Sequence, residues 1–278
     1  MTMTPTTQDA GSQSAGKSER SASARQRAGR VGYGLLGALV VLGAWYFLAV
    51  TELFGPGQTP RPDEVAAAGW TGFTSEGMLF DVRVSITRVL IGVALGAAMA
   101  VPVGFLLAWY PRLRATFDPL VNFFRALPPI ALIPLFIVYF GIGETARISI
   151  LVYAAFFASV VVLYEGISSL DPLLIRASKV LGANSWEVFA KCVVPAAVPH
   201  LFTGLRVAFG VSWATLVAAE LLAANRGLGA VIQNARTFFQ IPDIYVGIVL
   251  IGLSALVMDY LLRVVQRYAT RWQERTQR

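Results

Sequence analysis

The sequence is poor in the residue types that build metal sites, disulfides and charged surfaces. It has one cysteine, Cys192, and one histidine, His200. These counts exclude a disulfide framework, a cysteine-based zinc or iron–sulfur site and a multi-histidine centre, so we expect no metal site in this chain. Only 14% of the residues are charged, whereas soluble domains carry about 25%. Together with a hydrophobic content of 56%, this shortage of charge excludes a disordered chain, a coiled coil and a DNA-binding domain. An integral membrane protein, or a soluble protein with an unusually large apolar core, remains.

Long apolar windows separate these two possibilities. A helix that crosses a bilayer needs about 20 mostly apolar residues. We find six such windows, and a soluble core rarely needs that many. The sequence therefore predicts an all-α polytopic membrane protein, with a transmembrane domain over residues 30–268. The six predicted spans cover residues 31–50, 86–109, 119–140, 148–163, 202–222 and 244–262. Prolines 128, 129 and 134 should bend or break the third of these spans.

The distribution of Lys and Arg predicts the orientation. Cations are concentrated before the first span, after the last span and in the even-numbered loops, which places both termini in the cytoplasm. Residues 1–29 are polar and predict a disordered cytoplasmic tail rather than a cleavable signal peptide. Residues 269–278 form a second cytoplasmic tail. The net charge of +7 is thus mainly a topology signal. It could also favour anionic lipid, but it does not indicate nucleic-acid binding.

The loop over residues 164–200 is the most informative segment. Asp171-Pro172 predicts a helix start, and Gly182 predicts its end after Leu181. Asn184 and Glu187 have the spacing of a capping box for a second short helix. Pro195 and Pro199 should end that helix and turn the chain back into the membrane. Two short helices that meet at a glycine corner could still be a simple linker.

The spacing of this corner resembles the EAA loop of ABC importer permeases. Arg176-Ala177-Ser178 stands in the E-A-A place, Gly182 follows after three residues, and Cys192-Val193-Val194-Pro195 follows after nine more. The leading Glu is replaced by Arg176, and the Ile and Leu are replaced by Cys192 and Val194. Residues 125–144 and 204–229 are similar to the third and fifth spans of the taurine, aliphatic-sulfonate and nitrate permeases. The resemblance covers roughly residues 63–267, and the taurine permeases look most similar.

The resemblance implies the type I ABC importer permease fold in a bacterial inner membrane. Two permease copies, expected as a homodimer, would bind two ATPase subunits that hold ATP and Mg²⁺, and a binding protein would deliver the substrate. The sequence has no G-x-x-x-x-G-K-[ST] loop, so this chain should not hydrolyse ATP itself. Residues 183–189 would form the coupling helix. The residues implied in ATPase coupling are Arg176, Ala177, Gly182, Ala183, Asn184, Ser185, Trp186 and Glu187. Helix capping alone, or interfacial anchoring by Trp186, would also explain several of them.

The fifth predicted span carries polar residues on one face. Arg206, Trp213 and Glu220 are seven residues apart and fall near one helix face. Ionisable groups inside a membrane usually face a bundle interior or an aqueous cavity. The candidate translocation path therefore comprises Pro129, Arg206, Ser212, Trp213, Thr215 and Glu220. In the alternative, Arg206 and Glu220 sit at the two interfaces and Trp213 packs between helices. If this face lines the path, Glu220 would lie near the external mouth. A carboxylate there would need a paired cation to bind an anion, and Arg226 is the candidate.

The family resemblance leaves the substrate open. A sulfonate such as taurine is the first candidate, with nitrate, bicarbonate, an aromatic carboxylate or a thiamine-pyrimidine precursor as alternatives. An ion-driven secondary transporter would usually show internal inverted repeats, and none is evident by eye. A membrane scaffold would tolerate loss of the Gly182 corner. A membrane enzyme would need a nucleophile–base pair or a ligand cluster in its loops, and none is visible. His200 is interpreted as a boundary residue, and Cys192 as a packing residue.

Overall fold

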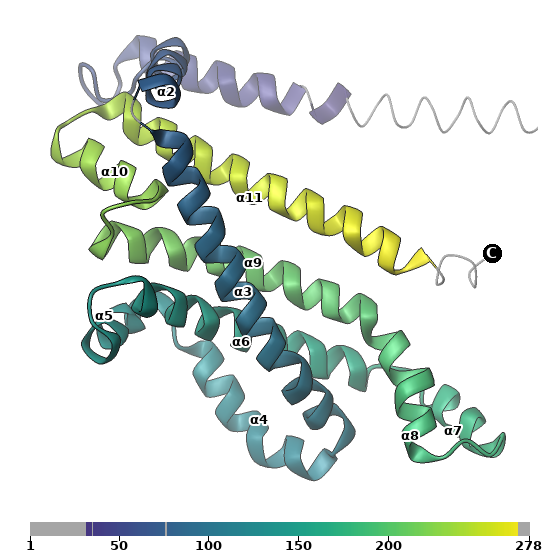
Figure 1. The fold of residues 1–278 in the computed structure, drawn as a ribbon. Coiled ribbons are helices and arrows are strands. Elements are labelled where there is room, and N and C mark those ends of the chain that lie inside the picture. Colours follow the sequence, from purple (N-terminus) through teal and green to yellow (C-terminus); the bar gives the residue numbers. More distant parts are fainter. Residues whose placement is uncertain (1–31, 35, 76, 272–278) are drawn as a thin grey trace, which may run out of the picture. The chain divides into compact units, whose positions relative to one another are not determined.

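The computed structural model describes residues 32–75 and 77–271, apart from residue 35 (Figure 1). These residues form helices joined by short loops, with no strand among them, which confirms the predicted all-α fold class. The predicted tail at residues 1–29, and residues 272–278 of the other tail, lie outside the described residues. The chain divides into two compact units, up to Ala66 and from Ala67 onward.

The first unit holds one long apolar helix, Gly32–Thr51. A turn-rich segment follows, and the Trp45 Nε1–H donates a hydrogen bond of 3.1 Å to the Pro60 carbonyl. Helix α2 (Pro62–Ser75) then leads the chain into the second unit. Its first turn carries Asp63 and Glu64, where acidic side chains favour the positive end of the helix dipole.

The second unit contains the remaining helices (Figure 1). Among the described residues, five helices are long and apolar enough to cross a membrane, or six spans if the bent pair α4 and α5 is counted as one. The helices of the second unit, long and short, are α3 (Met78–Trp109), α4 (Pro111–Ala126), α5 (Pro129–Phe140), α6 (Glu144–Ser168), α7 (Pro172–Val180), α8 (Ser185–Val188), the π-helical turn η1 (Phe189–Val193), α9 (Val194–Ala223), α10 (Leu228–Thr237) and α11 (Ile241–Ala269).

The third predicted span is not one continuous helix. It is divided between α4 and α5, whose axes form an angle of 92°. Leu127 and Pro128 between them have extended backbone conformations. Neither Pro128 nor Pro129 has an N–H to donate, and each proline disfavours helical geometry in the residue before it. The two adjacent prolines therefore end α4 and start α5 in a new direction.

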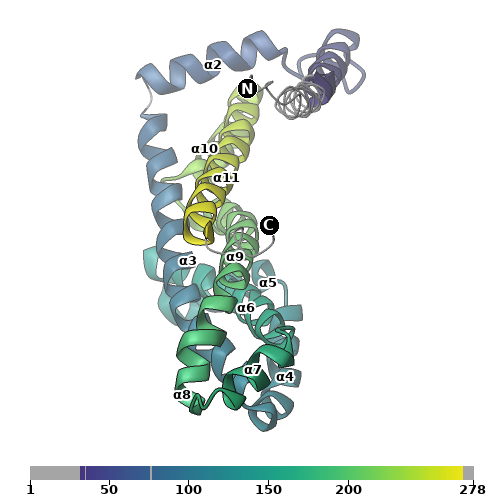
Figure 2. The ribbon, with the colours of Figure 1, turned by 90° about the vertical axis from the view of Figure 1, so that its right-hand side faces the viewer.

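Helices α3, α6 and α9 form the centre of the second unit (Figure 2). Helix α3 approaches α6 closely because Gly92 and Gly96 face it. A Cβ atom at Gly96 would lie 2.6 Å from the Ala155 Cβ and 2.8 Å from the Val152 carbonyl oxygen. Small residues at helix–helix contacts allow this close packing in membrane proteins. The core residues include Val89, Val93, Leu151, Ala155, Ala208 and Leu216.

The end of the second short helix also differs from the prediction. Helix α8 does not end at Pro195 or Pro199, because η1 joins it directly to α9. The Val194 N–H donates to the Phe189 carbonyl, five residues earlier. Pro195 lies in the first turn of α9, directly after η1, so its missing N–H falls where the hydrogen-bond pattern changes from π to α. Pro199 lies inside α9 and leaves only one backbone carbonyl without its usual helical donor.

Candidate functional site

The corner between α7 and α8 is built by helix caps. The Asp171 carboxylate accepts a 2.8 Å hydrogen bond from the Leu173 N–H at the start of α7. At the end of α7, the Gly182 N–H donates to Lys179 and the Ala183 N–H donates to Ser178. This pair of bonds is a Schellman motif. Gly182 has φ +87°, and no atom lies within 4 Å of a Cβ built there. The left-handed backbone, rather than lack of space, requires glycine.

The predicted capping box is present at α8. The Glu187 N–H donates to the Asn184 side chain at 2.8 Å, and the Asn184 N–H donates to the Glu187 carboxylate at 3.0 Å. Lys191 lies 3.2 Å from the same carboxylate. The hydrogen bond from the Asn184 backbone, followed by the Lys191 interactions, holds the pKa of Glu187 below its usual value. The carboxylate therefore stays ionised and caps the first turn of the four-residue helix.

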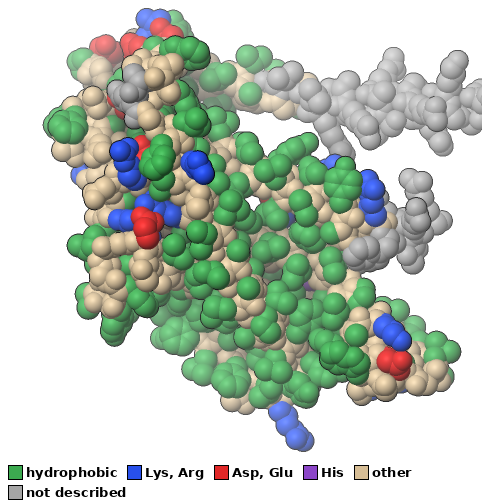
Figure 3. Space-filling view, viewed as in Figure 1, with side chains coloured by type: hydrophobic (Ala, Val, Ile, Leu, Met, Phe, Trp, Pro, Cys, Tyr) green, Lys and Arg blue, Asp and Glu red, His purple; other side chains and the backbone are tan. Residues whose placement is uncertain are grey.

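Exposed apolar side chains surround this corner. Val180 and Leu181 are each 87% exposed, and Trp186 is 71% exposed. The Trp186 ring stacks on Phe189 at a centroid distance of 5.8 Å. A groove of ≈ 500 Å³ lies between α3 and α8, and a second groove of ≈ 390 Å³ lies between the end of α7 and η1. Figure 3 shows exposed hydrophobic side chains at this end of the molecule. An exposed apolar patch beside grooves is typical of a surface that binds another protein.

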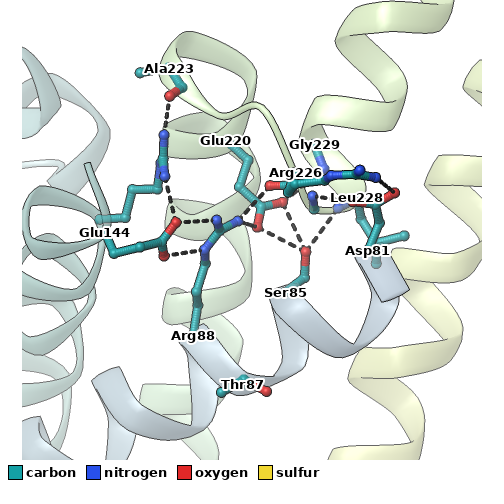
Figure 4. A network of polar contacts seen from close by, with 12 residues as sticks. Asp81, Ser85, Thr87, Arg88, Glu144, Glu220, Ala223, Arg226, Leu228 and Gly229 are labelled. Carbon is teal, nitrogen blue, oxygen red and sulfur yellow. Dashed lines mark hydrogen bonds and ion pairs between the residues drawn. The ribbon is translucent and has the colours of Figure 1, made fainter. Parts of the chain in front are cut away.

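A second candidate site is a buried polar network where α3, α6, α9 and α10 meet (Figure 4). Three consecutive N–H groups at the start of α10 donate to side chains of other helices. The Gly227 N–H donates to Asp81, the Leu228 N–H to the Ser85 hydroxyl and the Gly229 N–H to Glu220. The N-terminus of α10 is thus capped from α3 and α9, which fixes α10 against both of these helices.

Arg88 is the central cation of this network. It donates to Glu220 at 2.6 Å and to Glu144 at 2.7 Å, and it also donates to the Arg226 carbonyl. Arg147 donates to Glu144 at 2.7 Å and to the Ala223 carbonyl. Arg88 and Glu220 are 4% and 1% exposed. Two charges are tolerated at such burial because each has a charged partner and further hydrogen bonds.

The sequence interpretation was wrong about the partner of Glu220. The suggested cation, Arg226, lies 3.9 Å from Asp81 instead, and Arg88 binds Glu220. The signal that could have found this pair is the cost of a charge inside a membrane. Arg88 and Glu220 both lie within predicted spans, and each therefore required an opposite charge on another span.

The other candidate path residues do not gather at one surface. Trp213 is 5% exposed and packs in the core with Val89, Leu151 and Met258. Ser212 and Thr215 are buried on α9, while Arg206 pairs with Asp259 of α11 at 2.9 Å. Pro129 starts α5, at the break described above. Among the described residues, these contacts show packing and ion pairing, and the predicted role in translocation stays a prediction.

Comparison with known proteins decides the family. The family model of the binding-protein-dependent transport system inner membrane component matches residues 92–275. This chain belongs to that family. The importer permease is 44% identical over 245 residues to a probable ABC transporter permease protein of Brucella abortus. The aligned residues cover 88% of this chain and 97% of the relative. It is 36% identical to the taurine transport system permease protein TauC of Escherichia coli K12, over 84% of this chain and 86% of TauC.

Solved structures show the same fold. The importer permease is similar to the inward-facing MetNI methionine ABC transporter, with a TM-score of 0.58 and 21% identity over 69% of this chain and 97% of that chain. It is also similar to an amino acid ABC transporter, with a TM-score of 0.56 and 15% identity over 69% of this chain and 92% of that chain. The fold is therefore that of an ABC importer permease.

Proposed function

We propose that this permease carries a small anion across the membrane, with taurine or another sulfonate as the first candidate. The proposal is supported by the similarity to TauC and by 28% identity to a putative aliphatic sulfonates permease, SsuC, of Bacillus subtilis. A bicarbonate permease, CmpB, of Synechococcus elongatus is 29% identical. Bicarbonate is therefore an alternative substrate to test. Nitrate, an aromatic carboxylate and a thiamine-pyrimidine precursor are the further alternatives that the sequence resemblance implies.

We place the α7–α8 corner in the cytoplasm, where it would bind the ATPase. The Lys and Arg distribution that places both termini on that side supports this orientation. Two ATPase subunits would hold ATP and Mg²⁺, and a second copy of this chain would complete the pore. An extracytoplasmic binding protein would deliver the substrate to the opposite end, where α10 is fixed by the buried network.

The observation that carries the proposed coupling to an ATPase is the way in which α8 is held at both ends. Its start is fixed by two reciprocal hydrogen bonds, its end is joined to α9 without a loop, and Trp186 is left exposed. Closure of the ATPase dimer would therefore move α8 and α9 together. That movement would alternate access to the pore, while hydrolysis would reset it.

The proposal is tested by reconstitution. The permease is assembled in nanodiscs with a candidate ATPase and a binding protein, and ATP hydrolysis is measured against taurine, alkanesulfonates, nitrate, bicarbonate and aromatic carboxylates. We expect one ligand-loaded binding protein to stimulate hydrolysis. Trp186→Ala should reduce this stimulation about tenfold or more, because exposed aromatic residues are frequent hot spots of interfaces. Tyr260→Ala, on α11, is the control of similar exposure (66%).

Two results would count against the proposal. Stimulation that survives Trp186→Ala unchanged would remove α8 from the coupling surface. Uptake of the anion into vesicles without any ATPase, driven by an ion gradient, would favour the secondary transporter instead.

A further inference from the structure

Helix α7 has no buried residue among its nine. Leu173, Arg176, Ala177 and Val180 are spaced i, i+3, i+4 and i+7, so they form one stripe along the helix. All four are exposed. An amphipathic helix normally buries its apolar side against another element. The exposed stripe therefore indicates a surface that another molecule covers.

The two cations of α7, one in the stripe and one beside it, have no acidic partner among the described residues. Arg176 and Lys179 are exposed and take part in no ion pair there. Both nearby carboxylates are already occupied. Asp171 caps α7, while Glu187 caps α8 and pairs with Lys191. The corner consequently presents unpaired positive charge beside exposed apolar side chains.

We propose that Arg176 and Lys179 select an ATPase whose docking surface carries carboxylates beside an apolar groove. The inference rests on the proposed function and adds the chemistry of the partner surface. The carboxylates would face Arg176 and Lys179, and the groove would receive Leu181 and Trp186. Complementary charge of this kind contributes more to partner choice and association rate than to total affinity.

A protein surface fits this arrangement better than a bilayer surface does. Leu173 at the start of α7 is 67% exposed, and Val180 and Leu181 at its end are each 87% exposed. The exposed patch continues past the Gly182 turn to Trp186 on α8, so two helices contribute to it. Helices that lie on membranes present one continuous apolar face, often over 20 or more residues. Helix α7 has nine residues.

The test reverses the two charges. Permease with both Arg176→Glu and Lys179→Glu is compared with wild type for binding to an ATPase from the same genome that co-purifies with wild type. We expect the dissociation constant to rise about tenfold or more, and wild-type binding to weaken with salt more than binding of the double variant does. Arg112→Glu is the control, since Arg112 is an exposed residue in the first turn of α4, where Glu suits the helix dipole.

Two further measurements keep the test decisive. The neutral variant with Arg176→Gln and Lys179→Gln should show a smaller loss of affinity, and size-exclusion profiles report whether each variant is folded. Reversal of partner carboxylates to Lys should restore binding of the double Glu variant. The alternative partner, an anionic membrane surface, is tested by flotation. Each variant is held in detergent-free peptide discs and floated with vesicles of anionic phospholipid, and the fraction bound to the vesicles is measured.

The outcomes separate this inference from the proposed function. Wild-type affinity in the double Glu variant overturns the charge assignment and leaves the importer function intact. Loss of vesicle binding with unchanged ATPase affinity assigns the cations to lipid and also overturns it. Failure of wild type to bind any ATPase from its genome overturns both.

Discussion

At the scale of single residues, the Arg88–Glu220 pair places two opposite charges in the interior of the second unit. Both side chains are almost fully buried, and Glu220 also accepts from Ser85 and from the Gly229 N–H. Removal of one member would leave the other charge in an apolar interior with fewer partners. The cost of such a removal is about 3–5 kcal/mol.

Glu220→Gln should therefore destabilise the permease. The amide would remove the negative charge opposite Arg88 and would place an NH₂ group among donors. We expect the melting temperature in detergent to fall by roughly 5–10 °C, from about 3 kcal/mol and the usual dependence for chains of this size. Glu165→Gln, at an exposed site on α6, is the control. Equal melting temperatures for the two variants would show that the buried pair contributes nothing.

The residue scale also shows what sequence reasoning could reach. The caps of α7 and α8 could be predicted because Asp171, Gly182, Asn184 and Glu187 act on backbone groups within a few residues. The partner of Glu220 could not be identified by proximity, since Arg88 is 132 positions away in the chain. Sequence reasoning needed the rule that buried charges pair, and the relative rotation of α3 and α9, which spacing alone does not supply.

At the scale of elements, the contact between α3 and α6 is set by glycines. Gly96→Val should separate the two helices, because the added atoms would overlap Ala155 and the backbone at Val152. We expect a loss of about 1–3 kcal/mol, measured as a lower melting temperature. Gly252→Val on α11 is the control, where no atom lies within 4 Å of an added Cβ. If Gly96→Val melts no earlier than that control, the close approach is incorrect.

Helix identity was easier to predict than helix ends. The apolar windows identified the long helices, because burial in lipid demands a minimum run of apolar residues. Proline positions were less informative. The pair Pro128–Pro129 breaks a span, whereas Pro195 and Pro199 are accommodated in one helix. Pro195 follows a π turn and stays within the helix, whereas Pro129 starts a new helix. A single sequence does not show which of these two backbone geometries a proline will adopt.

At the scale of the whole molecule, the proposed orientation makes the two ends of the second unit chemically distinct. Arg112 marks the proposed cytoplasmic end, because it follows Tyr110, which lines the same groove as Trp186. Phe238, which follows α10, marks the opposite end. In a chain with Cys192→Ser, Arg112→Cys should react with a membrane-impermeant maleimide only after the membrane is opened. Phe238→Cys, at a position 71% exposed, should react in intact spheroplasts. The reverse pattern of labelling would invert the assigned topology.

The π turn η1 has one more consequence. Residues 185–223 form one helical segment of 39 residues, which carries Trp186 near its first turn and Glu220 near its last. Hydrogen bonds of the main chain therefore connect the corner to the buried network, with no intervening loop to absorb a displacement. A displacement of α8 would therefore tilt α9 about its contacts with α3 and α6 and would move the end that carries Glu220.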